Sequence, residues 1–282
     1  EKGKQIHEHI VNQGLLNKDT MLGNALVDMY AKCGMMLKAQ EVLEEIPSRD
    51  IVSWSSLISG YAQHGQGNEA LNCFEWMQIE GINPNMVTFI CLLKACGSTG
   101  ALDKGKQIHD EIVTRGLLEK EIMLGNALVD MYAKCGELSR AREVLKELPL
   151  RNAASWNALI VGYAQKGQVH EVLNCFEEMK SEGLSPDEVT LLCVLNACSH
   201  AGAVDTGNAY FEALNLGEYG PMPTLEHYMC MIDLLSRAGQ VDDALRVITL
   251  MPFHPNLLIW HTVLSASKKW GIVELGEHAF AH

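Results

Sequence analysis

The 282-residue chain lacks the sequence features of membrane proteins, metal proteins and most enzymes. No apolar run approaches the roughly 20 residues that span a bilayer. The nine cysteines never form the C-x-x-C pair that is common in zinc sites. A P-loop, a G-x-S-x-G sequence and the dinucleotide-binding glycine pattern are also missing. These absences predict a chain without a membrane span, bound metal, cofactor or enzymatic activity of its own.

One triplet has the form of part of a catalytic zinc site. His109, Asp110 and Glu111 form an H-x-E sequence, which supplies a metal ligand and a proton-transferring acid in zinc deaminases. Those enzymes also need P-C-x-x-C, which this chain lacks. We therefore expect the triplet to be part of an amphipathic helix, and any deamination to require a further C-terminal domain or a partner.

Positive charge is also scarce. The chain has 22 Lys and Arg against 35 Asp and Glu, which gives a net charge of -13. Nonspecific nucleic-acid binders are usually basic, because phosphate contacts dominate their affinity. Charges on the outer face of a repeat array are screened within about 8 Å at physiological salt, so the net charge does not exclude nucleic acid. It predicts weak nonspecific affinity and dependence on matched bases.

The chain does contain a repeat of 102 residues. The fourteen residues from Met21 to Gly34, MLGNALVDMYAKCG, recur unchanged from Met123 to Gly136. Regularly placed glycines divide the 102 residues into units of 31, 35 and 36. These glycines are Gly34, Gly65, Gly100, Gly136, Gly167, Gly202, Gly239 and Gly271.

Each unit contains two stretches with helical periodicity. In one unit, the first apolar stripe is Leu57, Ile58, Tyr61 and Ala62, and the second is Ala70, Leu71, Phe74 and Met77. A glycine between the stripes, Gly65 in this unit, is expected to close the first helix in the left-handed conformation. One such hairpin cannot bury its apolar face alone, so neighbouring hairpins must stack. The repeat therefore predicts an all-α solenoid.

The cysteines follow the same repeat. Eight of the nine form pairs separated by 102 residues, and Cys230 is the exception. This pattern is typical of repeat-consensus residues, so we expect structural thiols in a reducing compartment. The pairs are Cys33 with Cys135, Cys73 with Cys175, Cys91 with Cys193, and Cys96 with Cys198.

The units carry motifs of one family. Residues 20–50 and 122–152 contain GNALVDMYAKCG. Residues 86–121 contain LLKACGSTGALDKGKQIH, and residues 188–224 contain a related form. Residues 51–85 and 153–187 share SW and GYAQ segments. These units resemble the short, long and 35-residue pentatricopeptide repeats of the plant PLS subclass. Residues 225–256 resemble its terminal short repeat, 257–282 the start of an E-type extension, and 1–19 the second helix of a partial long repeat. The resemblance covers the whole chain and implies one continuous, right-handed superhelical solenoid.

The resemblance implies sequence-specific binding of single-stranded organellar RNA, usually to direct C-to-U editing. In this family each repeat contacts one base through its fifth and last residues, while its second residue packs on the base. The implied base-reading pairs are Asn24 with Asp50, Ser55 with Asn85, Asn126 with Asn152, and Asn157 with Asp187. The implied base-packing residues are Met21, Val52, Val87, Met123 and Ala154. Five corresponding residues do not fit the simple correspondence: Ile90, Glu121, Leu192, Met229 and Asn256.

Under that correspondence an Asn/Asp pair favours uracil, Ser/Asn favours adenine, and Asn/Asn favours a pyrimidine. The implied core is 5′-U-A-n-C/U-U-3′, with n opposite residues 86–121. Between the two copies Asp50 becomes Asn152, and Ser55 becomes Asn157, so small polar residues replace one another where bases are chosen. Asp and Asn before a helix are also favoured as N-caps, and both roles can coexist in one residue.

Three lysines are candidate phosphate contacts: Lys32, Lys134 and Lys166. They lie where helices are expected to end, so favourable interaction with the helix dipole is the alternative. The resemblance also implies small editing cofactor proteins at the long units and a deaminase-bearing protein at the E-type tail. It further implies a chloroplast or mitochondrial location, with the targeting peptide outside these residues.

Two other functions remain open. Helical-hairpin arrays such as tetratricopeptide proteins bind peptides, which makes a protein-interaction scaffold the competing class. Their unit is a regular 34 residues with a W-x-x-L-G-x-x-Y pattern that this chain lacks. An RNA-binding role in splicing or transcript stability is the other alternative, and the E-type tail favours editing over it.

Overall fold

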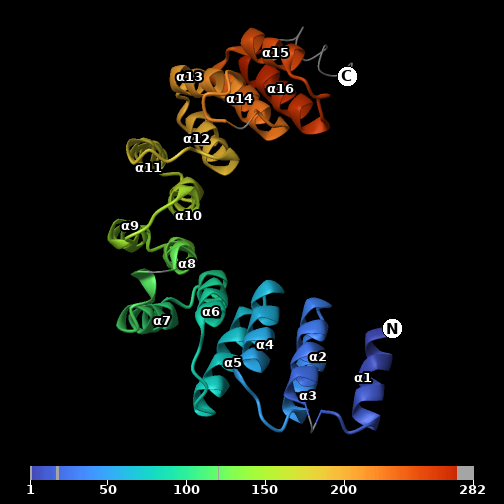
Figure 1. The fold of residues 1–282 in the computed structure, drawn as a ribbon. Helices are drawn as coiled ribbons and strands as arrows, with labels where there is room; N and C mark the ends of the chain where they lie inside the picture. The colour runs from blue at the N-terminus through green and yellow to red at the C-terminus, as the bar shows by residue number, and fades with distance from the viewer. Residues whose placement is uncertain (1, 17–18, 120, 221, 272–282) are drawn as a thin grey trace. The chain divides into compact units, whose positions relative to one another are not determined.

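The computed structural model describes residues 2–16, 19–119, 121–220 and 222–271. Within these residues the chain forms sixteen α-helices, one short 3-10 helix and no strand, which confirms the all-α class (Figure 1). None of the helices in these ranges is long and apolar enough to cross a membrane. The chain divides into two compact units, Glu1–Leu150 and Arg151–His282.

The first unit consists of one helix followed by four helical hairpins. The first helices of the hairpins, α2, α4, α6 and α8, pack side by side in chain order, and each also packs against the second helix of its own hairpin (Figure 1). The helices are α1 (Lys2–Asn12), α2 (Thr20–Lys32), α3 (Met36–Glu45), α4 (Ile51–Gln63), α5 (Gly67–Ile79), α6 (Met86–Thr99), α7 (Leu102–Thr114), the 3-10 helix η1 (Leu117–Glu119), α8 (Ile122–Lys134) and α9 (Leu138–Glu147).

The second unit continues the same pattern with three hairpins and a final helix. The first helices α10, α12 and α14 stack in order, and α16 packs against α14. The helices are α10 (Ala153–Gln165), α11 (Val169–Ser181), α12 (Glu188–Ala201), α13 (Val204–Asn215), α14 (Leu225–Ala238), α15 (Val241–Leu250) and α16 (Leu257–Trp270).

The glycines that punctuate the sequence end the first helices. All eight have positive φ angles, from 66° at Gly202 to 85° at Gly136, which confirms the left-handed conformation expected at Gly65. Gly81 and Gly183, with φ 74°, end the second helices of their hairpins in the same way. A residue with a side chain is strained at such φ values, so these positions favour glycine.

The core lies between stacked hairpins, as the periodicity predicts. Leu57, Ile58 and Tyr61 on α4 are buried, and Phe74 on α5 is 2% exposed. Gly60 allows a close approach between the first helices α2 and α4, because a Cβ atom there would lie 2.6 Å from Cβ of Ala31 on α2. The small residues thus set how tightly successive hairpins pack.

A buried tryptophan fixes the beginning of α4 relative to the next loop. Trp54 Nε1 donates to Glu80 Oε2 at 2.8 Å, and Glu80 also forms an ion pair with Arg49. The second unit repeats the arrangement, with Trp156 Nε1 3.0 Å from Glu182 Oε2. These contacts hold the N-terminal turn of a first helix, where the candidate base-reading residues lie.

Candidate functional site

The four side chains that the sequence predicts to be the last residues of repeat units cap the helices that follow them. Asp50 accepts hydrogen bonds from the backbone N–H groups of Val52 and Ser53, both at 2.9 Å. Asn85, Asn152 and Asp187 accept from the third residue of α6, α10 and α12, respectively, and all four residues form capping boxes. This confirms the N-cap role, which typically contributes about 0.5 to 2 kcal/mol to helix stability.

The fifth residues of the first helices lie beside these caps. Asn24 Nδ2 donates to Asp50 Oδ1 and Oδ2 at 3.1 and 3.3 Å. Asn157 Nδ2 lies 2.8 Å from each carboxylate oxygen of Asp187. Two of the expected Asn/Asp pairs are therefore brought together by hydrogen bonds between consecutive hairpins.

The Ser/Asn pair is joined through a third side chain. Ser55 Oγ lies 2.8 Å from Thr88 Oγ1, and Thr88 Oγ1 donates to Asn85 Oδ1 at 2.9 Å. Ser55 is only 8% exposed, because the neighbouring first helix covers it. Sequence reasoning paired Ser55 with Asn85 but gave Thr88 no part in the site.

The remaining expected pair, Asn126 with Asn152, falls at the division between the two units. Asn126 lies on α8 of the first unit and is half-buried. Asn152 caps α10 of the second unit through Ser155 N–H at 3.0 Å. Their pairing stays a prediction from the sequence.

The Asp50 carboxylate is held in its ionised form. Burial alone would raise its pKa, but hydrogen bonds from the backbone and side chain of Ser53, the Asn24 amide and the Val52 backbone together lower the pKa below its ordinary value. The site therefore presents a charged hydrogen-bond acceptor at neutral pH.

The positions that do not fit the simple correspondence lack this polar arrangement. Ile90 and Leu192 are half-buried apolar residues, and Glu121 precedes α8 without a side-chain capping bond. Asn256 caps α16 through Ile259 N–H at 3.0 Å, and its Nδ2 is 3.8 Å from Met229 Sδ. These sites offer an incoming base fewer fixed hydrogen-bonding groups.

The second residues of the first helices form exposed apolar positions. Met21 is 77% exposed and Met123 59%, and Val52, Val87 and Ala154 are also exposed. Val189 on α12, which sequence reasoning did not select, is exposed as well. Each lies three residues before a fifth-position side chain. For Met21, Val52, Met123 and Ala154 that side chain is polar, so apolar surface lies next to it along the same helix face.

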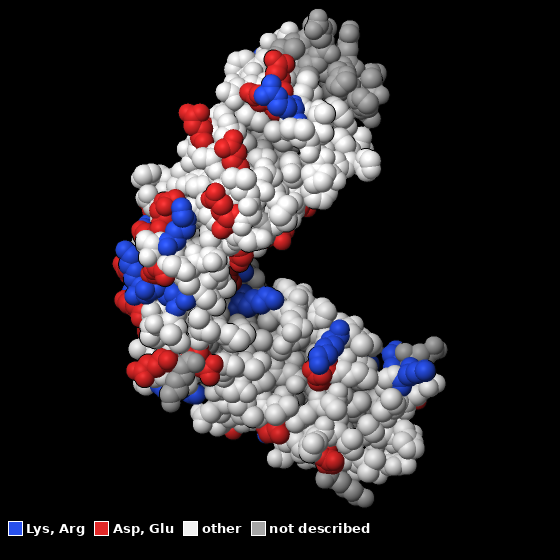
Figure 2. Space-filling model, turned by 45° about the horizontal axis from the view of Figure 1, so that its top comes forward, with Lys and Arg blue, Asp and Glu red and all other residues white. Residues whose placement is uncertain are grey.

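The candidate phosphate-contacting lysines interact with their own helices. Lys32 Nζ lies 2.7 Å from Asp28 Oδ2, and Lys134 Nζ lies 2.7 Å from Asp130 Oδ2. Lys166 is the C-cap residue of α10. On the face drawn in Figure 2, most basic side chains lie beside acidic ones instead of forming one basic patch. A phosphate group would have to compete with these acids.

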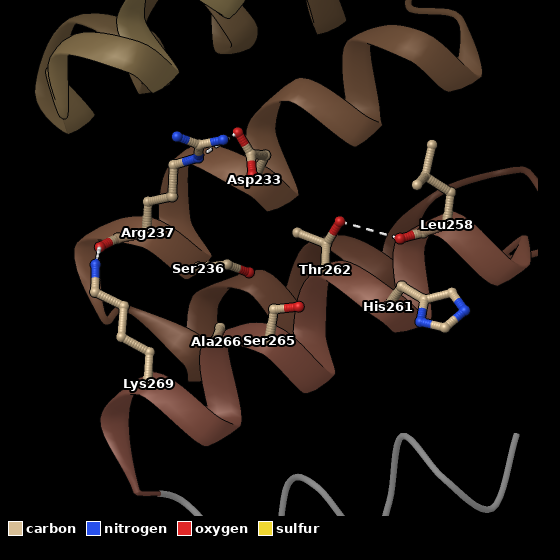
Figure 3. Close-up of a pocket in the computed structure, with 9 residues that line it drawn as sticks. All are labelled: Asp233, Ser236, Arg237, Leu258, His261, Thr262, Ser265, Ala266 and Lys269. Atoms are coloured by element: carbon tan, nitrogen blue, oxygen red, sulfur yellow. Dashed lines mark hydrogen bonds and ion pairs between the residues drawn. The ribbon is translucent and has the colours of Figure 1, made fainter.

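A pocket of about 480 Å³ lies between α14 and α16 (Figure 3). At one end are Arg237, which pairs with Asp233 at 2.7 Å, and Lys269, which donates to the Arg237 carbonyl oxygen at 3.3 Å. At the other end are Leu258 and His261, the second and fifth residues of α16. The pocket thus combines cations with apolar and hydrogen-bonding groups.

The H-x-E triplet lies on an amphipathic helix, α7, as expected. His109 is 5% exposed, and its Nδ1 is 2.9 Å from the hydroxyl of Tyr132. Burial lowers the pKa of His109, with a further contribution from Arg140, so the ring is neutral at pH 7. Among the described residues no group of His, Cys, Asp or Glu could hold a metal ion.

The nine cysteines are free thiols. Burial raises the pKa of several of them, to about 12 for Cys73 and Cys96. Such thiols are almost fully protonated at neutral pH and therefore react slowly. Their burial agrees with packing as their main role.

The stacked helical hairpins, with paired polar residues at the beginnings of the first helices, define the chain as a helical-repeat protein. A model of the PPR repeat family matches residues 49–98 and 151–200, and a model of the PPR repeat matches residues 24–51, 87–117, 126–152 and 226–253. Together these matches include most of the chain. The protein belongs to the pentatricopeptide repeat family.

Relatives and solved structures agree with this assignment. The chain is 44% identical over 276 residues to the pentatricopeptide repeat-containing protein At3g13770, mitochondrial, of Arabidopsis thaliana, covering 98% of this chain and 44% of the relative. It is 43% identical over 271 residues to the pentatricopeptide repeat-containing protein At4g38010 of the same plant, covering 95% of this chain and 48% of the relative. The chain thus spans about half or less of these relatives.

The fold is similar to that of the pentatricopeptide repeat protein PPR10 from maize, with a TM-score of 0.81 at 20% identity, over 99% of this chain and 40% of that chain. A second structure of PPR10, in complex with an 18-nt psaJ RNA element, matches with a TM-score of 0.79 at 18% identity over 99% of this chain and 41% of that chain. These similarities concern the fold.

Proposed function

We propose that this chain binds single-stranded RNA in a sequence-specific manner, with one base opposite each repeat. The main support for the proposal is the arrangement of three pairs: Asn24 with Asp50 and Ser55 with Asn85 in the first compact unit, and Asn157 with Asp187 in the second. Each places a polar fifth residue and a polar N-cap side by side, next to an exposed apolar second residue. This combination offers hydrogen bonds to a base edge and a surface for the base face.

The hydrogen bonds within each pair determine which atoms are left for a base. Among the hydrogen bonds of the described residues, Asp50 Oδ2 accepts only from Asn24, whereas Oδ1 also serves the helix cap. A carboxylate oxygen can accept more than one hydrogen bond, so Oδ2 has capacity for a donor. The N3–H group of uracil is such a donor. The same arrangement at Asp187 supports uracil there.

Asn85 offers the opposite polarity. Its Oδ1 accepts from Thr88 N–H and from Thr88 Oγ1, both at 2.9 Å, so its amide oxygen is directed toward the helix. The Nδ2 group then faces away from the cap and can donate to N1 of adenine. Ser55 has a smaller side chain than asparagine, which leaves more room for a purine. These contacts support the U, A and last U of the proposed core 5′-U-A-n-C/U-U-3′, in which n is opposite the apolar Ile90 and C/U rests on the sequence prediction for Asn126 and Asn152.

The pocket between α14 and α16 supports continuation of the RNA contact beyond the last pair. Leu258 and His261 occupy the same places on α16 that Val52 and Ser55 occupy on α4. Lys269 and Arg237 supply cations at the other end of the pocket. We place a nucleotide at the 3′ side of the core there, bound by packing and by phosphate contact instead of by a base-reading pair.

The biological role that the resemblance favours is selection of a cytidine for C-to-U editing. In this role the chain acts as an adaptor, with small editing cofactor proteins at the long repeats and a deaminase-bearing protein at the E-type tail, of which residues 272–282 lie outside the described residues. The mitochondrial name of one relative supports an organellar location. Splicing or transcript stability remains the alternative role within RNA binding.

Binding to short synthetic RNAs tests the proposal. A fluorescently labelled oligonucleotide with the core sequence should bind, and changing the first U, the A or the last U should each raise Kd by about tenfold or more, since one unmatched hydrogen-bonding group costs roughly 1 to 3 kcal/mol. Changing n should have little effect. Equal Kd values for all sequences would contradict base reading. No RNA binding at low salt, together with tight binding of a protein, would favour the scaffold function.

A further inference from the structure

A buried hydroxyl group connects the two residues of each pair. The third residue of α4, α6 and α12 is Ser53, Thr88 and Thr190, respectively, and all three residues are 0% exposed. Each belongs to the capping box of its own helix. Each also contacts the fifth residue of the preceding first helix, which lies 29 to 33 residues earlier in the chain. The hydroxyl therefore contacts both members of the pair.

The distances define what the hydroxyl does in the Asn/Asp pairs. Thr190 Oγ1 accepts from Asp187 N–H at 3.2 Å and lies 2.6 Å from Asn157 Oδ1, to which it donates. Ser53 Oγ likewise accepts from Asp50 N–H at 3.1 Å and donates to Asn24 Oδ1 at 2.5 Å. A hydroxyl has one proton, and in both cases the asparagine oxygen is its nearest acceptor.

This bond fixes the orientation of the asparagine amide. With Oδ1 of Asn157 directed at the hydroxyl, Nδ2 must face the Asp187 carboxylate, where it lies 2.8 Å from both oxygens. A flipped amide would place its oxygen against the carboxylate and its NH2 group against the hydroxyl, whose proton would then have only the more distant Asp187 Oδ1, at 3.0 Å, as an acceptor. Both changes are unfavourable. The amide in turn holds the carboxylate in the position from which Oδ2 can accept a hydrogen bond from a base.

The hydroxyl also sets the polarity of the Ser/Asn pair. Either hydroxyl can donate in the 2.8 Å contact between Ser55 and Thr88. When the single proton of Thr88 goes to Asn85 Oδ1 at 2.9 Å, Ser55 is the donor in that contact. The lone pairs of Ser55 Oγ are then available as an acceptor beside the donor Nδ2 of Asn85. An acceptor next to a donor complements the N6 amino group and N1 of adenine.

The sequence of this chain shows the same correlation between each first helix and the next first helix along the chain. Where the fifth residue is polar, the third residue of the next first helix carries a hydroxyl: Asn24 with Ser53, Ser55 with Thr88, Asn126 with Ser155, and Asn157 with Thr190. Where the fifth residue is apolar, it does not: Ile90 with Leu124, Leu192 with His227, and Met229 with Ile259.

Capping alone does not explain this correlation. Asn256 caps α16 through Ile259 N–H at 3.0 Å, although Ile259 has no hydroxyl. The residue that Asn256 meets from the preceding first helix is the apolar Met229. A cap can therefore form without the hydroxyl, and the hydroxyl is present where a polar fifth residue needs a partner.

We propose that Ser53, Thr88 and Thr190, through their hydroxyl groups, help to determine which RNA base each of these repeats prefers. They act as positioning residues, because they orient the two base-reading side chains without touching the base. Recognition at these repeats then depends on three residues instead of two. The proposal rests on the proposed RNA-binding function.

Thr190→Val tests the proposal, because valine has nearly the same shape and lacks only the hydroxyl. The backbone N–H of this residue still caps through Asp187 Oδ1, so α12 keeps that bond. At the last position of the core, we expect the Kd for RNA with C or A divided by the Kd for RNA with U to fall by about tenfold. The ratio at the first U, which depends on Ser53, should stay unchanged in the same variant.

Thr190→Ser is the matched control, since it keeps the hydroxyl and removes the methyl group, and it should retain the wild-type ratio. Ser53→Ala provides the reciprocal test, in which only the preference for the first U should be lost. This variant replaces Thr190→Val if circular dichroism shows that the valine variant does not fold. If the hydroxyl has only a structural role, its removal should weaken the binding of all RNAs equally and leave both ratios of Kd values unchanged. That result would overturn the proposal. Absence of RNA binding by the unaltered protein would overturn it together with the proposed function, so the two failures are distinguishable.

Discussion

Exchanging one base-reading pair for the other should move the preferred base. The double substitution Asn157→Ser with Asp187→Asn gives α10 and α12 the side chains that α4 and α6 already have at Ser55 and Asn85. Thr190 matches Thr88 in type and place, so the connecting hydroxyl is already present. Asparagine and aspartate are similarly good N-caps, so α12 should remain capped. The exchange therefore changes recognition with little change to the fold.

The expected magnitude follows from the atoms that change. Asp187 Oδ2, an acceptor held by Asn157, is replaced by an amide donor, so a hydrogen bond from uracil N3–H to a charged group, worth roughly 1.5 to 3 kcal/mol, is lost. A neutral hydrogen bond to adenine N1, worth roughly 0.5 to 1.5 kcal/mol, is gained. The difference between U and A should shift by about 2 kcal/mol or more, which corresponds to at least about 30-fold in the ratio of the two Kd values.

Selection from a randomised RNA pool, followed by Kd measurements on single oligonucleotides, provides the assay. The last position of the core should change from U to A while the other positions keep their preference. The reciprocal exchange, Ser55→Asn with Asn85→Asp, is the matched control and should change the second position from A to U. If the last position keeps its uracil, or if a different position changes, the assignment of these residues to that base is wrong.

The other predictions concern charge, packing and pH. If Lys134 leaves its ion pair with Asp130 to contact an RNA phosphate, Lys134→Ala should lower the slope of log Kd against log salt by about 0.7 and retain the base preference. An unchanged slope would mean that Lys134 only stabilises its helix. Gly60→Ala should lower the free energy of unfolding in urea by roughly 1 to 3 kcal/mol, because the new Cβ would lie 2.6 Å from Ala31 Cβ and force α2 and α4 apart. His109→Phe should flatten the pH dependence of Tm below pH 7. Burial lowers the pKa of His109 in the folded protein, so the neutral ring stabilises the fold above the unfolded pKa of about 6.5. This stabilisation of the fold is lost as the pH falls through the folded pKa. Equal slopes for both proteins would contradict that assignment.

Much of the fold could be predicted because it depends on local patterns. The stripe of Leu57, Ile58 and Tyr61 fixes the buried face of α4, and Gly65 fixes where that helix ends, since few other residues adopt its φ of 73°. The ion pair of Lys32 with Asp28 likewise depends only on helical spacing of four residues. Each of these features can be read within one or two turns of the chain.

The connections within the candidate site could not be predicted in the same way. Ser55 and Thr88 are in contact although they are 33 residues apart in the sequence. This contact depends on how far one hairpin is displaced along the next, and the helical periodicity of the sequence does not specify that displacement. The family resemblance supplied the pairing of Ser55 with Asn85, but not the hydroxyl between them. A signal was present, since Thr88 and Thr190 both follow an Asn or Asp cap by three residues, yet capping alone accounts for such a pattern.

The acidic charge of the chain is consistent with recognition that depends on bases. Lys32 and Lys134 are neutralised by acids on their own helices, so a phosphate gains little from them unless it displaces those acids. The groups at the pairs, by contrast, are held in place before RNA binds: the Asn157 amide and the Asp187 carboxylate already face each other at 2.8 Å. Preorganised groups lose little entropy on binding a matching base and cannot rearrange to suit a mismatched one. A chain with net charge -13 should therefore bind matched RNA through its bases and release mismatched RNA readily, which is the behaviour that selection of one site in a transcript requires.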